Sequence, residues 1–229
     1  MRHQLLPLLL SLLFGHSLLT AAEPFTVNTG WIADKPEMLT YKTTSKQGEG
    51  LYQVTLTKTA AGVEIYLNII ANGFTKTIAA SLTPEMRPIR STSRIHVNGQ
   101  ISMETECSYG KEKLHIATLM KPYNRTMETD LPADGPVMDF SQTPVMSRVL
   151  PLKAGASWSF PSVDPQTNTI VPLTLRVTGE AVVRGIDCYT VEMNDFEGTS
   201  VQWVEKGGAR RIVRIEQTEA KRVSELILP

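Results

Sequence analysis

The sequence predicts a mostly β protein made of one domain, with about ten antiparallel strands and one short helix. Over most of the chain, hydrophobic side chains recur at every second position, which is the period of a strand with one buried face. Short clusters of Gly, Asn and Pro separate these segments, and the period of an amphipathic helix is scarce. No internal repeat, low-complexity run or change of composition divides the chain, so we expect a single domain.

The first half of the chain predicts a meander of hairpins. Apolar residues alternate with polar ones on both sides of a turn at Ala60–Gly62, and Asn98-Gly99 is a strong hairpin signal. The predicted strands of this half are Tyr52–Leu56, Val63–Ile69, Phe74–Leu82, Arg94–Val97, Gln100–Ser108 and Leu114–Met120.

The segment between Leu131 and Pro151 interrupts the strand pattern, because three prolines occur within it. Only Met138–Leu150 could hold a short helix there, and this helix would plug or flank the sheet. Strands then resume, and the predicted ones are Val171–Val177, Asp187–Met193, Thr199–Val204, Arg211–Ile215 and Val223–Leu228.

The first 22 residues have the features of a secretory signal peptide. Arg2 precedes the apolar run Leu5–Phe14, and small residues end the segment at Ala22. Polar residues and a proline interrupt the run, and no later apolar stretch is long enough to span a bilayer. We therefore expect cleavage after Ala22, export to the periplasm or the medium, and a mature domain of residues 23–229 without a transmembrane segment.

The charge of the mature chain gives no attraction to nucleic acid. Removal of Arg2 leaves 22 basic and 23 acidic side chains, a net charge of 22 − 23 = −1. A local basic excess could suit an anionic head group or a cell-wall polymer, but interleaved glutamates favour a self-paired surface. The basic residues are Lys206, Arg210, Arg211, Arg214, Lys221 and Arg222, and the glutamates are Glu205, Glu216, Glu219 and Glu225.

Residues suited to catalysis or metal binding are few. His96 and His115 are the mature histidines, and neither a G-x-S-x-G elbow nor an H-E-x-x-H motif occurs. A thiol pair of Cys107 with His115 would fall in plain hairpin strands, and a zinc site lacks ligands at short spacing. We expect a protein that is not an enzyme and has no cofactor and no metal.

The two cysteines of an exported protein could pair. A disulfide between Cys107 and Cys188 would close a loop of 188 − 107 = 81 residues and stabilise the fold by about 4–5 kcal/mol in the chain-entropy model. The alternative is two buried free thiols, because Cys188 alternates with Tyr189 and Val191 and the direction of Cys107 is open. We predict the disulfide.

The second half of the chain also contains an ordered series of short segments. They are Arg148–Leu152 with Gly155, the Trp158/Phe160 strand, Gly185 followed by Asp187–Glu192, Gln202–Val204 and Arg211–Glu216. In their order and spacing, over roughly residues 90–228, they resemble an uncharacterised family of exported bacterial proteins with a domain of unknown function, 3108-like. Members usually have Pro-Ala-Gly-Thr before the cysteine strand, where this chain has Val183-Arg184-Gly185-Ile186.

The resemblance implies a fold but no activity. The implied fold is a curved antiparallel sheet, a half-barrel, wrapped around the helix, and it is similar to the periplasmic lipoprotein carriers LolA and LolB. A bent sheet with one apolar face can hold a hydrophobic chain, with Met138–Leu150 as a movable lid or a permanent plug.

Two functions therefore remain open. The first is a binding module for a hydrophobic or lipid-like ligand, whose cavity Trp31, Tyr66, Trp158 and Trp203 could line. The same four aromatic side chains could instead pack the core beneath the helix. The second function is a structural or assembly partner in the cell envelope, which would use an exposed sheet edge or the basic surface.

Overall fold

One large curved sheet forms most of the molecule. The computed structural model describes residues 27–133 and 135–228, so the predicted signal peptide, residues 1–22, lies outside the described part. The first strands are β1 (Glu37–Ser45), β2 (Gly48–Thr59), β3 (Gly62–Ala71), β4 (Phe74–Leu82), β5 (Pro88–Val97), β6 (Gln100–Tyr109), β7 (Lys113–Met120) and β8 (Arg125–Pro132). The later strands are β9 (Met138–Asp139), β10 (Ser157–Asp164), β11 (Thr169–Val183), β12 (Ile186–Asp195), β13 (Gly198–Glu205), β14 (Ile212–Gln217) and β15 (Arg222–Leu226).

The helical segments of the described chain are short. They are the 3₁₀ turns η1 (Lys121–Tyr123) and η2 (Phe140–Gln142) and the α-helix α1 (Thr143–Val149). Among the described residues, no helix combines the length and the apolar character that a membrane span requires.

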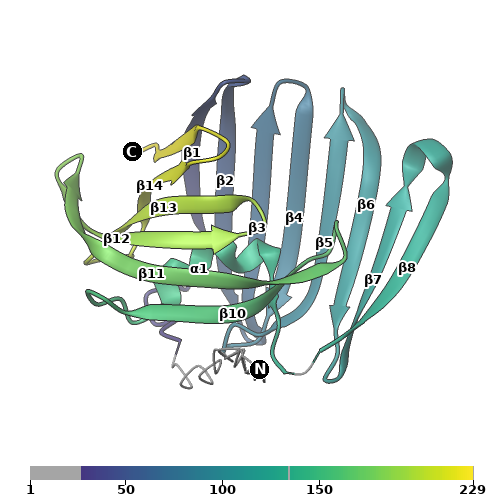
Figure 1. Cartoon of the computed structure of the whole chain (residues 1–229), viewed down its shortest axis with the longest axis horizontal. Coiled ribbons are helices and arrows are strands. Elements are labelled where there is room, and N and C mark those ends of the chain that lie inside the picture. Colours follow the sequence, from purple (N-terminus) through teal and green to yellow (C-terminus); the bar gives the residue numbers. More distant parts are fainter. Residues whose placement is uncertain (1–26, 134, 229) are drawn as a thin grey trace, which may run out of the picture.

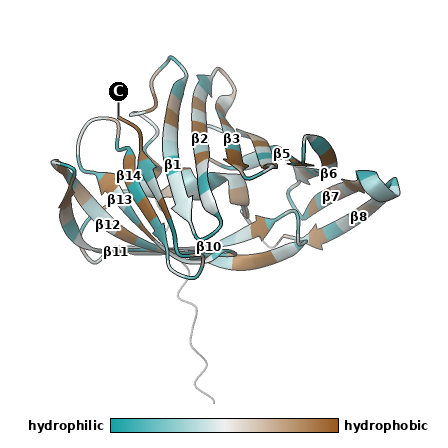
Figure 2. Cartoon of the chain, turned by 90° about the horizontal axis from the view of Figure 1, so that it is seen from above, coloured by the Kyte–Doolittle hydropathy of each residue, from teal (hydrophilic) through white to brown (hydrophobic). Residues whose placement is uncertain are grey.

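Two meanders share this sheet. Strands β1–β8 pair in chain order, β9–β15 do the same, and β1 pairs with β15 to join them, from Tyr41–Leu226 to Thr44–Val223. The described pairs are antiparallel except for β9 with β10. The sheet curls so that β10–β13 cross the direction of β1–β5, with α1 between the two parts (Figure 1). Strands β6–β8 extend sideways beyond this curl (Figures 1 and 2).

The predicted fold class is confirmed and the predicted number of strands is too low. The sheet has fifteen strands rather than about ten. Strands β1 and β8 escaped the prediction because their apolar alternation is weak: Thr43 and Ser45 stand at inward positions of β1, and the first four residues of β8 are exposed. The two-residue strand β9 is too short to leave a pattern.

The main hydrophobic core lies between the curled sheet and α1. It joins Leu39, Tyr41, Val54, Leu56 and Ile65 on one part of the sheet to Leu173, Leu175, Val191, Val204 and Ile212 on the other. From the helix it takes Val145, Met146 and Val149, none of which is measurably exposed. A smaller cluster under β6 and β7 contains Cys107, Leu114, Ile116, Ala133, Val137 and Val163.

The predicted helix is present, but it is shorter than Met138–Leu150. Asp139 begins the helical segment with a capping box, in which its side chain accepts from Ser141 N (2.7 Å) while Gln142 Oε1 accepts from Asp139 N (2.8 Å). Leu150 is extended, as expected for a residue before proline, and α1 therefore ends at Val149.

Asp139 also ties the start of the helical segment to the sheet. Its side chain is buried, and Oδ2 accepts hydrogen bonds from the hydroxyls of Ser91 on β5 (2.6 Å) and Tyr109 on β6. Burial, together with the negative charge of Asp139, raises the pKa of Tyr109 far above its usual range. The Tyr109 hydroxyl therefore remains a donor, and this buried carboxylate fixes the helix entry.

Arg148 fastens the other end of the helix. Its guanidinium is 1% exposed, donates to Glu37 Oε2 (2.8 Å) and to the carbonyls of Ala209 (2.7 Å) and Arg210 (3.0 Å), and lies 3.9 Å from the ring centre of Trp31. In return, Arg210 donates to the carbonyl of Leu150 at the helix end (2.6 Å). Because all seven residues of α1 are buried and both ends are fixed, the helix is a plug of the core rather than a lid.

Candidate functional site

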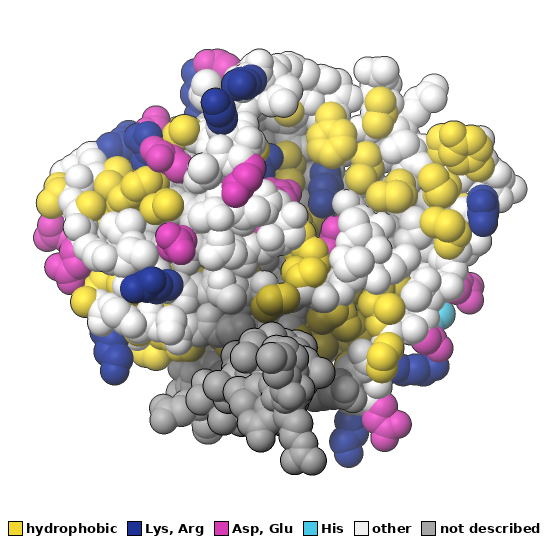
Figure 3. Space-filling model, in the orientation of Figure 1, with side chains coloured by type: hydrophobic (Ala, Val, Ile, Leu, Met, Phe, Trp, Pro, Cys, Tyr) yellow, Lys and Arg dark blue, Asp and Glu magenta, His cyan; other side chains and the backbone are white. Residues whose placement is uncertain are grey.

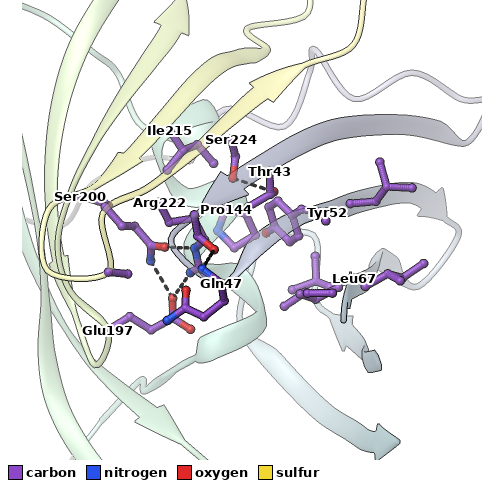
Figure 4. Close-up of a pocket in the computed structure, with 18 of the residues that line it drawn as sticks. Thr43, Gln47, Tyr52, Leu67, Pro144, Glu197, Ser200, Ile215, Arg222 and Ser224 are labelled. Carbon is purple, nitrogen blue, oxygen red and sulfur yellow. Dashed lines mark hydrogen bonds and ion pairs between the residues drawn. The ribbon is translucent and has the colours of Figure 1, made fainter. Parts of the chain in front are cut away.

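A cavity of about 500 Å³ opens into the curled sheet beside α1. Strands β1, β2 and β3 form one wall, the ends of β12 to β15 form the facing wall (Figure 4), and Phe140, Thr143 and Pro144 of the helical segment also line the cavity. Lining residues Gln47, Asn72, Glu197 and Ala220 come from hairpin turns or strand ends, which therefore surround the mouth. This volume lies in the range of small-molecule binding sites.

The cavity exists because the plug is shorter than the strands. Seven helical residues span about 10 Å, whereas strands of 8 to 12 residues span about 25–40 Å. A long wall strand such as β2 thus has one end that contributes to the core around α1 and an outer end that lines the cavity. On β2, for example, Val54 and Leu56 belong to the core, whereas Tyr52 and Gly50 line the cavity.

The deeper lining is mostly apolar. Its side chains include Tyr52, Leu67, Ile69, Phe74, Phe140, Pro144, Met193 and Ile215. Burial and the neighbouring Tyr41 ring, 5.6 Å away between centroids, raise the pKa of Tyr52 well above its usual range. The phenol is therefore neutral, and the body of the cavity suits a hydrophobic molecule.

Polar side chains occupy the mouth and the wall of β13–β15. Arg222 pairs with Glu197 (2.6 Å), and Gln217 bonds to both partners, donating to Glu197 (2.6 Å) and accepting from Arg222 (Figure 4). Across the β1–β15 junction, the hydroxyls of Thr43 and Ser224 lie 3.0 Å apart. The site thus combines an apolar body with a hydrogen-bonding end.

Asp195 is the carboxylate of the lining with the most unfavourable surroundings. Its only hydrogen bond described is accepted from Glu197 N in the β12–β13 turn (2.8 Å), and it forms no ion pair with a described residue. Burial raises the pKa of Asp195 to about 6, although the bond from Glu197 N and the charge of Arg222 oppose the shift.

Because its pKa is raised, the ionised form of Asp195 destabilises the folded protein. The folded carboxyl titrates at about 6 and the unfolded one near 3.8, so the penalty is complete above pH 6 and disappears as the pH falls towards 4. We predict that Asp195→Asn raises the free energy of unfolding at pH 8 by about 1 kcal/mol, with partial exposure reducing the effect. Urea unfolding at pH 8 and pH 4 checks this, and a gain that persists at pH 4 would contradict the ionisation argument.

The four aromatic residues proposed to line a cavity are not brought together there. None of Trp31, Tyr66, Trp158 and Trp203 belongs to the described cavity lining. Trp31 and Trp158 pack against the main core, Tyr66 is exposed on the outer face of β3, and Trp203 lies beneath the Arg214 guanidinium, 5.7 Å from its ring centre. Core packing, the alternative weighed above, therefore describes Trp31 and Trp158.

The predicted disulfide is absent, because Cys107 and Cys188 are both buried free thiols. Cys107 packs with Val163, which pairs with Ile170 near the start of β11, whereas Cys188 pairs with Ala181, eleven residues further along that strand. At about 3.3 Å per residue, this separation is far beyond the roughly 7 Å between Cα atoms that a disulfide permits.

Both thiols should be unreactive in the folded protein. Burial raises the pKa of Cys107 to about 11 and raises the pKa of Cys188, so the reactive thiolate is scarce at pH 8. We predict that a thiol reagent modifies no cysteine in the native protein and two in the unreduced, denatured protein. Zero thiols after denaturation would contradict the free state.

The basic cluster is largely self-paired, as the interleaved glutamates indicate. Arg211 pairs with Glu205, Arg214 with Glu216 and Glu225, and Lys206 with Glu180. No group of three or more His, Cys, Asp or Glu side chains that could hold a metal ion occurs in the described part of the chain.

Some of the lining residues that the sequence analysis missed are polar side chains at inward positions of strands. Ser200 and Gln202 on β13 are examples, and Gln202 accepts from Ser147 of the helix (2.6 Å). Their signal is present in the sequence, since both stand in phase with the buried Val204.

Comparisons with known proteins give a family and a solved structure with a similar fold. A family profile described as a protein of unknown function (DUF3108) matches residues 38–221. A β-barrel-like protein from Brucella abortus with the domain of unknown function DUF1849 is similar in structure, with a TM-score of 0.58 at 10% identity, over 84% of this chain and 95% of that one. A DUF1329 family protein from Desulfovibrio piger matches at a TM-score of 0.32 and 9% identity, over 86% and 85%. No curated protein matches.

Proposed function

Because the chain belongs to the DUF3108 family of proteins of unknown function, its family gives no activity, and we propose from the cavity that it binds one hydrophobic or amphiphilic, lipid-like molecule. The observation that carries the proposal is the unfilled apolar space of about 500 Å³ above the plug helix. A core that served stability alone would fill this space, since protein interiors are normally close-packed.

The polar mouth supports a ligand with two chemical ends. An alkyl chain would contact Leu67, Ile69, Phe140 and Ile215, and its polar end would reach the hydrogen-bonding groups of Glu197, Ser200 and Arg222. This arrangement matches the usual form of small-molecule sites, in which few polar groups orient a mostly apolar ligand. We place the protein outside the cytoplasm because of its signal-like first 22 residues, and the expected likeness to LolA and LolB fits a binding or carrier role in the periplasm.

A second candidate is an assembly partner in the cell envelope. Strand β8 ends the sheet, and Val97, Ile101, Tyr123 and Met127 are exposed apolar side chains on the β5–β8 part. Figure 3 shows hydrophobic side chains gathered on this part of the surface. Charges on β8 at Arg125, Glu128 and Asp130 oppose edge-to-edge pairing, however, so the cavity favours the binding role.

Uptake of Nile red, a neutral fluorescent dye, tests the proposal. Wild-type protein should bind the dye at one site per chain with a blue-shifted emission. Ile69→Trp should weaken binding at least tenfold, because the larger side chain projects from β3 into the cavity. Tyr66→Trp is the matched control, since it lies on the same strand but on the exposed outer face and should leave binding unchanged.

Urea unfolding of both variants establishes that each remains folded. If the wild-type protein takes up no dye, or if both tryptophan variants bind as the wild type does, the cavity is not a binding site and the envelope-partner role becomes the leading one.

A further inference from the structure

We infer that the polar end of the ligand is a positively charged amine, so that the cavity takes a cationic amphiphile rather than a fatty acid. This inference rests on the proposed function. Its basis is the arrangement of charged and buried polar side chains along one wall of the cavity. There, the Asp195 carboxylate and the Ser200 hydroxyl can accept hydrogen bonds that no described side chain donates.

Asp195 supplies the negative charge for such a head group. It stands at the end of β12, its side chain lines the cavity, and its described hydrogen bond comes only from the backbone of its own turn. A carboxylate accepts up to four hydrogen bonds, so most of its capacity is unused. An ammonium group would provide both the donors and the compensating charge that a partly buried carboxylate lacks.

Ser200 provides a second acceptor close to the first. Its side chain is 3% exposed, it lines the cavity, and its Oγ has no hydrogen-bond partner among the described residues. Ser200 pairs with Met193 across the β12–β13 hairpin, and Asp195 lies two residues further along on the same face. Diagonal neighbours of this kind lie about 7–8 Å apart, with their Cβ atoms somewhat closer, so one head group could contact both.

The remaining charges of the lining disfavour an anionic ligand. Arg222 is the one cation among the described lining residues, and both Glu197 and Gln217 already occupy its guanidinium. Glu49, a third carboxylate of the lining, pairs with Lys42 (2.7 Å). A fatty-acid carboxylate at Arg222 would therefore lie beside Glu197, which already neutralises this cation, and would also face Asp195.

Amine binding should weaken in acid. Burial is the main cause of the raised pKa of Asp195. Glu197 in its own turn and Glu219 in the β14–β15 turn add to the shift, Arg222 on β15 opposes it, and the neutral Tyr52 phenol of β2 lines the same cavity. Because Asp195 becomes neutral as the pH falls through about 6, the charge that attracts an ammonium disappears there, whereas an alkylamine keeps its own charge.

Three ligands with the same twelve-carbon chain test the inference: dodecylamine, glycerol monolaurate and laurate, each measured by displacement of Nile red below its micelle concentration. At pH 7.5 we expect wild-type protein to bind dodecylamine at least tenfold more tightly than laurate, with the neutral ester between them. At pH 5 the amine should lose most of this advantage. Asp195→Asn should abolish the preference at pH 7.5, whereas Glu192→Gln, on an outward position of β12, should retain it.

The outcomes separate the two proposals. If laurate or the neutral ester binds as tightly as the amine, or if Asp195→Asn keeps the preference, the inferred head group is wrong while the hydrophobic site stands. If the wild-type protein takes up neither Nile red nor any of the three ligands, the proposed function itself fails. The pH dependence of the wild type tests the same carboxylate without relying on the folding of a variant.

Discussion

Arg148→Ala should lower the free energy of unfolding by about 3–5 kcal/mol, the range found when one partner of a buried ion pair is removed. The guanidinium donates to Glu37 and to two carbonyls of the β13–β14 turn, and it covers the ring of Trp31. Its loss leaves these acceptors without a partner and releases the end of the plug helix. For a domain of this size, the midpoint of thermal unfolding should fall by about 10 °C.

Arg214→Ala is the matched control for this change. Arg214 also forms ion pairs, with Glu216 and Glu225, but its side chain is 33% exposed. The expected cost is therefore at most about 1 kcal/mol. Urea unfolding at pH 7.5 compares the two variants, and equal losses would contradict the role of Arg148 as the helix anchor.

Asp139→Ala should be nearly as severe, with a loss of about 3 kcal/mol or more. The carboxylate accepts from two hydroxyls, Ser91 and Tyr109, and from the backbone of Ser141 in a buried position. Removing it leaves several buried donors unpaired, each at a cost of about 1–3 kcal/mol unless water replaces the oxygen. The helix entry should loosen together with the β5–β6 hairpin.

Asp130→Ala offers the comparison for Asp139. Asp130 bonds to Lys113 (2.6 Å) and His115 (2.8 Å) on the solvent-exposed side of β7 and β8, so its removal should leave the free energy of unfolding almost unchanged. Amide hydrogen exchange of the native protein adds a local readout. If amide exchange in Asp139→Ala becomes faster only at residues outside the helical segment, the Asp139 carboxylate does not hold the helix entry.

Much of the sheet follows from the sequence because most strands are apolar where they meet the core around the helix. In β3, for instance, Val63, Ile65 and Leu67 all face inwards, and the alternation is unmistakable. In β1 the pattern weakens because the inward residues beyond Tyr41 line a cavity and need not be hydrophobic. A prediction based on buried faces thus detects the core and overlooks β1, where polar inward residues line the cavity.

The cavity itself was not predictable from residue type alone. Trp203 was expected to line it, but this side chain lies on the same face of β13 as Val201. Gln202 and Val204 lie on the opposite face, which points inwards. An inward glutamine between two apolar neighbours makes the hydrophobic alternation of β13 ambiguous. The anchor of the helix was equally hidden, since Arg148 bonds to residues 61 and 111 positions away in the chain.

Native mass spectrometry after incubation with a total lipid extract tests the central claim, that the cavity holds one lipid-like molecule, most directly. The account predicts that wild-type protein retains a single lipid-sized mass per chain and that Tyr66→Trp does so too. Ile69→Trp, with its cavity filled, should appear as the bare chain. A wild-type spectrum of the bare chain alone, or equal retention by Ile69→Trp, would contradict the account.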